Sequence, residues 1–549
     1  MIHISYMAHR FGRINRQVKV WVTLLACCLG IGFVPIAQAA GESDPVSGLA
    51  RLYVKKFEFI GNQVIPESQL AKIAEPYQGR WITSEGLEEL RQALTRHYMS
   101  QGYVNSGVLI PDQQMLDGVL RMQAVEGRLA YTEVINPGSL RTEYIADRMA
   151  SVTDPTQAFN IQALQQRLKL LKQDPRIENI DATVRPGAQR GAAELQIKIA
   201  EAALHHATLR YDNYGSAALH GERRGLDYHT LNLLGWGDTL DVNYSNTRGL
   251  NSKGFKYTWP LSRRNSRLSL HYAKSDASVL EVPFSQLDIV SAKESYAFGL
   301  HHPLIHQLGR DVAVGVTLRR QRGATTLFGS PYSFTRDLSD HTTVSSVLAF
   351  SQSWVERRED SAFALSSEFR VGTGLFGATQ HAADPDSRFH VVWAQGEWYR
   401  RLGLGSLLLR GSMQLSDDAL FSEQRFSLGG VSSVRGYREG ALSADQGVHF
   451  SLEWRAQLAD LLSFWETPKG LGTLQVVPFM DMGYAQNKGN TKLTANKLHS
   501  VGLGLRWNLN DLYHFRLDYG HALETGPKQP TQTLQDNGVH IGLSVKLSQ

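Results

Sequence analysis

The chain contains very little cysteine: its 549 residues include only Cys27 and Cys28, which adjoin each other near the N-terminus. The rest of the chain therefore offers no disulfide, no thiolate ligand for a metal and no cysteine nucleophile. Long apolar runs are missing too, since no stretch approaches the roughly 18 consecutive apolar residues that a helical membrane span requires. Covalent cross-links, thiol chemistry and membrane-spanning helices are thus excluded as the basis of the fold or the function.

The motifs of the common enzyme classes are absent as well. There is no H-E-x-x-H zinc motif, no phosphate-binding Walker loop and no G-x-S-x-G nucleophile elbow. Gly372-x-Gly374-x-x-Gly377 matches the dinucleotide fingerprint as a string, but no helix pattern follows it. The pairs His205-His206 and His301-His302 are poor metal ligands, because neighbours on a strand point to opposite faces. We therefore expect no enzyme, no catalytic residue, no cofactor and no metal site.

Residues 1–39 have the pattern of a secretory signal peptide. Four basic residues and no acidic one precede or open an apolar run that ends near Pro35, and Ala37-Gln38-Ala39 supplies a cleavage site. A lipoprotein box, Leu24-Leu25-Ala26-Cys27, is the rival interpretation, but apolar residues continue where a lipoprotein turns polar. Cleavage lowers the formal net charge from +5 to about +1, which predicts no nucleic-acid partner. Residues 40–50 then form a short N-terminal segment.

Helical and strand patterns alternate up to residue 203, and a first unit covers residues 51–129. Pro66 begins its first helix, where a missing N–H does no harm. Its second helix carries apolar residues spaced by three and four on one face: Leu87, Leu90, Leu94 and Tyr98. Its strands are expected at Val54–Ile60, Ser106–Pro111 and Val119–Val125. The order of elements is therefore β-α-α-β-β.

A second unit of the same plan covers residues 130–203. Asn160 caps a helix that Asp174-Pro175 ends, and its apolar face carries Leu164, Leu168 and Leu171. Strands are expected at Ile177–Val184 and Leu195–Ile199. Each unit has about 75 residues, which suffices for a small core. One interpretation of this pattern is two generic α+β modules.

Residues 204–549 consist almost entirely of strands in which apolar and polar residues alternate. On one strand Val448, Phe450, Leu452 and Trp454 interleave with His449, Ser451, Glu453 and Arg455. Strands of about ten residues with aromatic residues near their ends fit a tilted membrane span better than a soluble sandwich. We count about sixteen, and an even number closes into a barrel with an aqueous lumen and no free edge. Their expected centres are residues 210, 227, 243, 257, 271, 299, 316, 347, 367, 395, 410, 452, 478, 503, 517 and 543.

Short motifs narrow the family. The two units contain Gly61-Asn62, Gly102-Tyr103, Val125-Glu126-Gly127-Arg128 and the series Leu171…Pro175…Pro186-Gly187…Gly191…Leu195. In these residues and in their order of elements the units resemble POTRA domains. Two such units before an all-β, sixteen-stranded antiparallel transmembrane barrel resemble the outer-membrane transporters of two-partner secretion. These are the TpsB group, which includes the haemolysin secretion/activation and filamentous haemagglutinin transporters of the POTRA-barrel superfamily.

The sharpest motif within this resemblance is Val434-Arg435-Gly436-Tyr437, in the long connection 416–446 between the eleventh and twelfth strands. In the family this connection folds back into the barrel and places its arginine inside the lumen. A second motif, Phe479-x-Asp481-x-Gly483, lies on the thirteenth strand, and its three residues share one face. A third comprises Asp212-Asn213-Tyr214-Gly215 and Leu234-Gly235-Trp236-Gly237-Asp238, around the first strands.

Chemistry agrees with these positions. A guanidinium deep in a barrel needs a partner, and a carboxylate binds it in two-pronged fashion. We therefore expect Arg435 to pair with Asp481, the channel-loop motif thus meeting the barrel wall. Loss of either partner of such a buried pair costs about 3–5 kcal/mol.

The resemblance implies export of a large partner protein across the outer membrane of a Gram-negative bacterium, without nucleotide. The POTRA domains would capture the unfolded partner in the periplasm by strand addition, and the loop would leave the lumen to open the path. The partner would be an adhesin, a haemolysin, a haem-binding protein or a contact-delivered toxin, and the transporter a monomer in lipid. Two alternatives remain: a barrel-assembly factor of the same superfamily, which more often has three or more POTRA domains, and a porin or barrel enzyme.

Three features depart from the family pattern. The stretch between Ala40 and Arg51 is too short for both a pore-plugging helix and a linker. The chain ends in Gln549, where such barrels often carry an aromatic residue. Pro478 lies inside a predicted strand, where it cannot donate to the ladder, so we expect a local bulge there.

Overall fold

The computed structural model describes residues 51–334, 341–381, 385–461, 472–488, 492–510, 512–526 and 532–548. The predicted signal peptide, the segment 40–50 and Gln549 lie outside these residues. The chain divides into two compact units, with the change between Ala202 and Ala203. None of the helices in the described ranges is long and apolar enough to cross a membrane.

The first α+β module begins with two strands instead of the single strand predicted at Val54–Ile60. β1 pairs with a strand that the sequence analysis missed, β3, whereas β2 pairs in parallel with β5 and β5 pairs antiparallel with β4. The single-strand prediction is wrong because the chain changes partner at Lys55, whose N–H donates to the carbonyl of Gly118 instead. The elements are β1 (Leu52–Val54), β2 (Lys56–Ile60), α2 (Glu67–Ala74), η2 (Glu75–Tyr77), β3 (Arg80–Ile82), α3 (Ser84–Ser100), β4 (Gly107–Leu109) and β5 (Val119–Val125).

The second module repeats this strand order, with β6 parallel to β8 and β8 antiparallel to β7. Asn160 caps α5 as predicted, since its Oδ1 accepts from the backbone N–H groups of Gln162 and Ala163. The elements are β6 (Arg128–Ile135), α4 (Thr142–Met149), α5 (Ile161–Leu171), β7 (Ile177–Pro186) and β8 (Ala192–Glu201). Each module has its own apolar core, and the predicted helix faces lie in these cores: Leu87, Leu90, Leu94 and Tyr98 in the first, Leu164, Leu168 and Leu171 in the second.

Hydrogen bonds join the two modules to each other. The N–H of Phe159 donates to the carbonyl of Gly127 at 2.7 Å, and that of Ile161 to the carbonyl of Gly102 at 2.9 Å. The Asn105 amide also donates to the carbonyl of Gly191 at 2.9 Å. Three of the glycines that carried the POTRA resemblance, Gly102, Gly127 and Gly191, thus lie at the junction between the modules.

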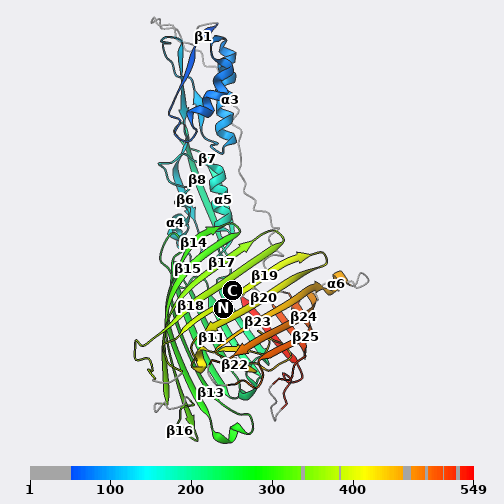
Figure 1. Cartoon of the computed structure of the whole chain (residues 1–549). Coiled ribbons are helices and arrows are strands. Elements are labelled where there is room, and N and C mark those ends of the chain that lie inside the picture. The colour runs from blue at the N-terminus through cyan, green and yellow to red at the C-terminus, as the bar shows by residue number, and fades with distance from the viewer. Residues whose placement is uncertain are drawn as a thin grey trace. The chain divides into compact units, whose positions relative to one another are not determined.

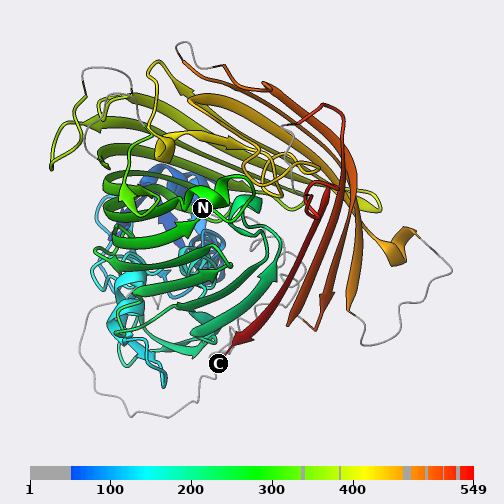
Figure 2. The same cartoon turned by 90° about the horizontal axis from the view of Figure 1, so that it is seen from below.

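The remainder of the described chain is a closed antiparallel barrel (Figures 1 and 2). Sixteen strands form its wall, β16 (Ser330–Pro331) being a two-residue extension of one hairpin, and the predicted number is confirmed. Every predicted centre falls within one of these strands. They are β9 (His205–Asp212), β10 (Arg223–Thr230), β11 (Thr239–Asn246), β12 (Leu250–Pro260), β13 (Arg267–Ser278), β14 (Val290–Gln307), β15 (Arg310–Leu327), β17 (Thr342–Arg357), β18 (Ser361–Thr373), β19 (His390–Leu402), β20 (Gly405–Ser416), β23 (Gln446–Gln457), β24 (Thr473–Gln486), β25 (Lys497–Leu509), β26 (Tyr513–Ala522) and β27 (Val539–Ser548).

Two predictions about the strands are wrong. β14 and β15 have 18 residues each and β17 has 16, which is far longer than the expected ten, so these strands extend beyond the hydrocarbon layer. Pro478 causes no bulge, because the pairing of β24 with β23 resumes in the same register on both sides of it. Between Phe479 and Val476 the ladder with β23 lacks only the pairs of Pro478 and Val477, since proline has no N–H to donate.

Short elements complete the barrel unit. They are η3 (Ala217–Leu219), η4 (Phe284–Leu287), η5 (Ser422–Gln424), β21 (Phe426–Leu428), β22 (Leu442–Ala444) and α6 (Leu458–Leu461). Large apolar side chains are exposed on one face of the barrel strands, among them Phe255, Leu270, Phe298, Val316 and Met480. Because side chains alternate along a strand, residues one position away face the lumen. The barrel is therefore apolar outside and polar inside, as a membrane barrel requires.

Candidate functional site

The predicted loop 416–446 lies inside the barrel and has a structure of its own, and we call it the lumenal loop. Its strands β21 and β22 pair as a small hairpin, with Phe426 opposite Ala444 and Leu428 opposite Leu442. The turn between these strands carries the motif residues Val434, Arg435, Gly436 and Tyr437. A small apolar cluster holds the hairpin to the inner wall: Phe426, Leu428, Val434, Tyr437, Leu442, Ala444, Ala485 and Leu498.

The loop motif and the wall motif meet residue by residue. The guanidinium of Arg435 lies 3.4 Å from the centre of the Phe479 ring, a cation–π contact. Its Nε and Nη2 each donate to one oxygen of Asp481 at 2.7 Å, which is the predicted two-pronged pair. A Cβ added at Gly483 would lie 3.0 Å from the side chain of Val434, so only glycine leaves room for the loop at full contact. The spacing of Phe479, Asp481 and Gly483 on one strand face therefore matches the loop that covers them.

Arg435 has further partners that the sequence analysis missed. Its Nη1 donates to Glu453 of β23 at 2.8 Å and to Asp518 of β26 at 3.4 Å, and its Nη2 donates to Ser451 at 3.1 Å. The residue is only 1 % exposed, and Glu453, Asp481 and Asp518 are fully buried. One loop arginine thus bridges three strands of the wall, far more than the single pair that was expected.

These carboxylates also bind arginines of the wall itself. Glu453 receives Arg410 at 2.5 Å and Arg455 at 2.7 Å, and Asp518 receives Arg506 at 2.7 Å and Arg516 at 2.5 Å. We call this set, with Arg435 and Asp481, the arginine–carboxylate network. Alternation along the strand had already placed Glu453 and Arg455 on a polar face. Which residues of the network meet depends on the register between neighbouring strands, and no signal in the sequence gives that register.

Gly436 and Tyr437 hold the backbone of the turn against the wall. Gly436 has φ +91°, and a Cβ there would lie 2.9 Å from the carbonyl oxygen of Gly520 on β26. The hydroxyl of Tyr437 lies 2.9 Å from the carbonyl oxygen of His499, and it accepts from the N–H of Glu524 at 3.1 Å. Both motif residues therefore serve close backbone contact, for which glycine and a buried phenol are suited.

The next residue, Arg438, extends these contacts to two other loops. Its guanidinium pairs with Glu281 at 2.6 Å, in the β13–β14 connection, and with Asp536, in the β26–β27 connection. Gln535 beside it accepts from the N–H of Glu439 at 3.0 Å and donates to the carbonyl oxygen of Gly215 at 2.8 Å. The sequence motifs did not predict this second attachment, because Gly215 is the one residue among these that belongs to any of them.

The third predicted motif lies where the barrel closes. Asn213 follows β9 and bonds the last strand twice: its amide donates to the carbonyl of Val539 at 2.9 Å and accepts from the N–H of Ile541 at 2.8 Å. In the following turn, Asp238 accepts from the N–H of Leu234 at 3.0 Å and from the hydroxyl of Tyr257 at 3.0 Å. These residues hold the first strands and the junction between the first and last strands of the barrel. They do not belong to the arginine–carboxylate network.

Comparison with known proteins agrees with this geometry. The haemolysin secretion/activation protein family ShlB/FhaC/HecB matches residues 191–507, and the ShlB-type POTRA domain matches residues 52–127. The heme/hemopexin transporter protein HuxB of Haemophilus influenzae is 23 % identical over 488 residues, covering 84 % of this chain and 82 % of that protein. The outer membrane transporter CdiB of Dickeya dadantii is 21 % identical over 491 residues, covering 86 % of this chain and 84 % of its own.

Solved structures show the same fold. CdiB from Escherichia coli aligns with a TM-score of 0.66 at 17 % identity, over 94 % of this chain and 93 % of that one. BamA from Haemophilus ducreyi without POTRA domains 1–3 aligns with a TM-score of 0.55 at 12 % identity, over 90 % of this chain and 100 % of that one. At these identities both likenesses show the fold alone. The chain belongs to the haemolysin secretion/activation protein family ShlB/FhaC/HecB, the two-partner secretion transporters of the Gram-negative outer membrane, whose POTRA domains lie in the periplasm.

Proposed function

We propose that the barrel conducts one large secreted protein, that the lumenal loop closes the path at rest, and that no catalysis or nucleotide is involved. The observation that carries this proposal is the position of Arg435: a loop residue holds three strands of the inner wall through a buried network. A loop without a role in the lumen would not need a fully desolvated cation at its tip. A loop that closes the lumen at rest needs such a cation, because the buried ion pairs hold it in one position until it is displaced.

The partner is a secreted protein of the adhesin, haemolysin, haem-binding or contact-delivered toxin type. The names of the relatives support this range, since one is a heme/hemopexin transporter and others are CdiB transporters. The transporter works as a monomer in outer-membrane lipid, because the closed barrel leaves no strand edge in need of a neighbour. Export then depends on capture, passage and folding outside, and none of these steps needs a catalytic residue.

Capture takes place by strand addition to the POTRA domains. In the second module β7 is an edge strand of ten residues whose other side pairs with β8. An extended peptide that adds to such an edge gains backbone hydrogen bonds whatever its sequence. In the first module the edge strands of the three-stranded sheet are shorter, with five residues in β2 and three in β4. We therefore expect the second module to be the main binding site for the unfolded partner.

Mass spectrometry of three fractions tests the function: culture supernatant, surface-shaved peptides and isolated outer membranes, from wild type and a clean deletion. Loss of one or two proteins from the outside, with other barrels unchanged, is the expected result. Complementation with wild-type chain restores that protein, whereas Arg435→Ala at normal barrel levels does not.

A barrel-assembly factor is the second candidate, and the superfamily likeness to BamA favours keeping it in the test. The same fractions separate the two functions. A broad fall in outer-membrane barrels in the deletion strain would mean an assembly factor, and no change in any fraction would mean a passive pore.

A further inference from the structure

A second group of charged residues lines the lumen, on strands that do not contact Arg435. Lys256 of β12, His271 of β13 and Arg319 of β15 lie in one continuous cross-strand row, with Ala297 of β14 between the last two. Lys293 lies on the same face of β14, four residues before Ala297. The opposite faces of these strands carry the exposed apolar residues Phe255, Leu270, Phe298 and Val316. The four basic side chains therefore belong to the lumen, and we call them the cationic wall.

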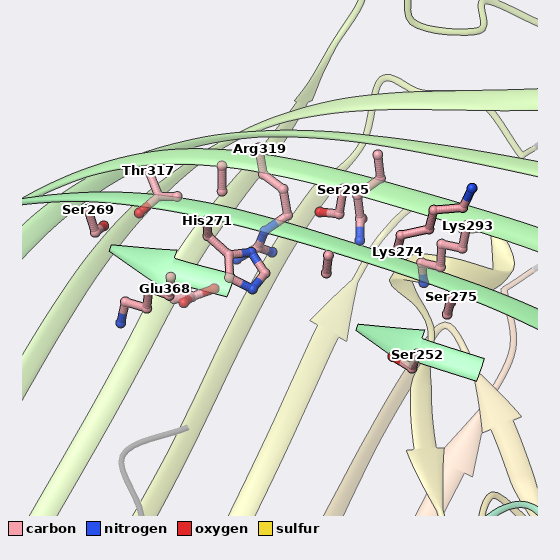
Figure 3. A pocket seen from close by; sticks show the side chains of 14 residues that line it. Ser252, Ser269, His271, Lys274, Ser275, Lys293, Ser295, Thr317, Arg319 and Glu368 are labelled. Carbon is pink, nitrogen blue, oxygen red and sulfur yellow. The ribbon is translucent and has the colours of Figure 1, made fainter. Parts of the chain in front are cut away.

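The cationic wall borders a cavity of about 530 Å³ (Figure 3). His271 and Arg319 extend into it from neighbouring parts of the sheet, and Glu368 of β18 faces them (Figure 3). Serine, alanine and threonine make up most of the remaining lining, so the basic groups are not covered by bulky neighbours. Glu368 is the one acidic residue among those that line the cavity.

The basic groups of this wall have no fixed partner. In the part of the chain that the structure describes, Lys256, Lys293 and Arg319 form no hydrogen bond or ion pair. The nearby carboxylates attract these cations without a hydrogen bond to them, Glu368 acting on Arg319 and Glu423 of the lumenal loop on Lys293. Glu368 itself pairs with Arg370 at 2.7 Å, and Glu423 accepts from the hydroxyl of Thr343 at 3.2 Å. Asp241, opposite Lys256 on β11, receives His229 at 2.5 Å. Excess positive charge therefore remains on this side of the lumen.

We propose that the cationic wall binds carboxylate side chains of an acidic, extended segment of the exported polypeptide while it passes through the barrel. The inference rests on the proposed function and names the chemistry that the channel offers to its cargo. Lys256 and Arg319 are separated by three strand spacings, about 14 Å between backbones, so one small ion does not engage the whole row. Successive carboxylates on one face of an extended chain recur about every 7 Å and can engage it step by step.

Weak and repeated contacts suit a conducting pore. A site in a channel must attract its ligand and still let it leave, and several separate cations achieve this better than one tight pair. A cleft lined by charges of one sign raises the local concentration of opposite charges and their association rate by about 10–1000-fold. Salt screens such an attraction over roughly 10 Å at 0.1 M ionic strength. The cationic wall therefore predicts faster entry of acidic than of basic polypeptide, with a strong dependence on salt.

Single-channel recording with the full chain in planar bilayers tests the proposal. The probes are two 12-residue peptides, one alternating Glu and Ser and the other alternating Lys and Ser, added from the POTRA side. The recording uses the full chain with Arg435→Ala, in which the lumenal loop is released and the barrel conducts. In this open form, the Glu peptide blocks current with an association rate at least about tenfold higher than that of the Lys peptide, and the difference shrinks in 1 M salt. Equal rates for both peptides, or no block by either, overturn the proposal. All further variants carry Arg435→Ala as well.

A matched pair of variants locates the effect. Lys293→Gln/Arg319→Gln removes two lumenal charges and is expected to lower the Glu-peptide rate about tenfold. Lys253→Gln/Arg322→Gln removes one lysine and one arginine from the other face of β12 and β15, where both side chains are exposed, and leaves the rate unchanged. Equal loss in both variants overturns the proposal. The heat-modified gel shift of the folded barrel shows that each variant is folded.

Reversal potentials in a KCl gradient show whether the cationic wall binds small anions such as chloride or the carboxylates of a polypeptide. If the lumenal variant loses chloride preference but keeps its rate for the Glu peptide, the wall binds small anions only and the proposal fails. Failure of the proposed function is read separately, from the exported protein in the deletion strain. If the barrel prefers the Glu peptide in bilayers but the deletion strain loses no exported protein, the cationic wall binds acidic peptide and the proposed export function is wrong.

Discussion

Two sides of the same lumen differ in how their charged residues are paired. Along β23–β26, Glu453, Asp481 and Asp518 each receive at least one guanidinium within 2.7 Å, and Arg435 of the lumenal loop joins all three. Along β12–β15, Lys256, Lys293 and Arg319 have no such partner in the described residues. Paired charges fix one geometry, because removing a partner leaves a desolvated ion. Charges without such a partner do not hold one geometry, so they remain available to an exported polypeptide that moves past them.

Removing the loop arginine should have the largest effect. Arg435→Ala leaves Asp481 and part of the charge of Glu453 without their loop partner, which costs about 3–5 kcal/mol, less where water enters the lumen. We expect a freely conducting barrel and loss of export, measured by single-channel recording and by the partner in the supernatant.

The matched control keeps the charge and changes its shape. Arg435→Lys retains the cation but loses the two-pronged geometry, so partial export is expected. If Arg435→Ala exports normally at normal barrel levels, the arginine–carboxylate network does not control export.

A single substitution on each side compares the two walls directly. Arg516→Gln removes a partner of Asp518 at 2.5 Å, and the expected loss of barrel stability is about 1.5–3 kcal/mol. Arg319→Gln removes an unpaired cation, and the expected change is within about 0.5 kcal/mol. Urea titration of both variants in the same detergent measures the difference. Similar destabilisation by the two changes would show that the contrast between the walls is not real.

A smaller effect is expected where the loop backbone touches the wall. Gly436→Ala forces a Cβ onto a residue with φ +91°, 2.9 Å from the carbonyl oxygen of Gly520. We expect the seated loop to lose about 1–2 kcal/mol, with more frequent channel openings and a folded barrel. The same substitution at Gly377, which also has positive φ but has nothing within 4 Å of its Cβ, serves as the control for strain alone. Equal opening frequency in the two variants would mean that contact with Gly520 does not hold the loop.

The smallest effect concerns an ion pair outside the lumen, in the second POTRA module. Burial alone raises the pKa of Asp174, but the charge of Arg176 and hydrogen bonds from Tyr144 and Arg176 outweigh it and hold the pKa below the ordinary value. A lowered carboxyl pKa stabilises the fold above the unfolded value near 4, and that stability is lost as pH falls through the folded value.

Hydrogen exchange of α4 and α5 in the full chain measures this contribution. Protection is expected to be constant from pH 7 to 5, apart from the intrinsic exchange rate, and to fall below about pH 4. Asp174→Asn should remove this acid-dependent fall at a cost of about 1 kcal/mol at neutral pH. If the variant keeps the full pH dependence, the carboxylate of Asp174 is not its source.

The barrel could be predicted from the sequence because its signal is local. Alternation put Phe479, Asp481 and Gly483 on one strand face, and Met480 and Met482 on the opposite face are exposed in the structure. The contact between Arg435 and Asp481 followed from a family motif together with this alternation. The contacts of Arg435 with Glu453 and Asp518 did not follow, because they depend on how far neighbouring strands are shifted against each other.

The same limit applies to the cationic wall and to the first POTRA strand. Lys256, His271 and Arg319 are far apart in the sequence, and only the cross-strand register brings them into one row. At Lys55 the chain changes strand partner within an apolar run that looks continuous, since a hydrophobic pattern reports burial and not pairing. Long-range register is therefore the information that the sequence pattern lacks.

The most direct test of the central claim is a reversible disulfide between the lumenal loop and the wall. Val434→Cys/Gly483→Cys is suitable, because the Val434 side chain would lie 3.0 Å from a Cβ at Gly483 and the chain has no other cysteine beyond Cys28. If the loop must leave the wall, the oxidised transporter exports no partner, and a reductant restores export to the level of the single-cysteine variants, which is the same with and without oxidant. Normal export by a fully cross-linked transporter would contradict the account, because the chain would then pass with the loop still in place.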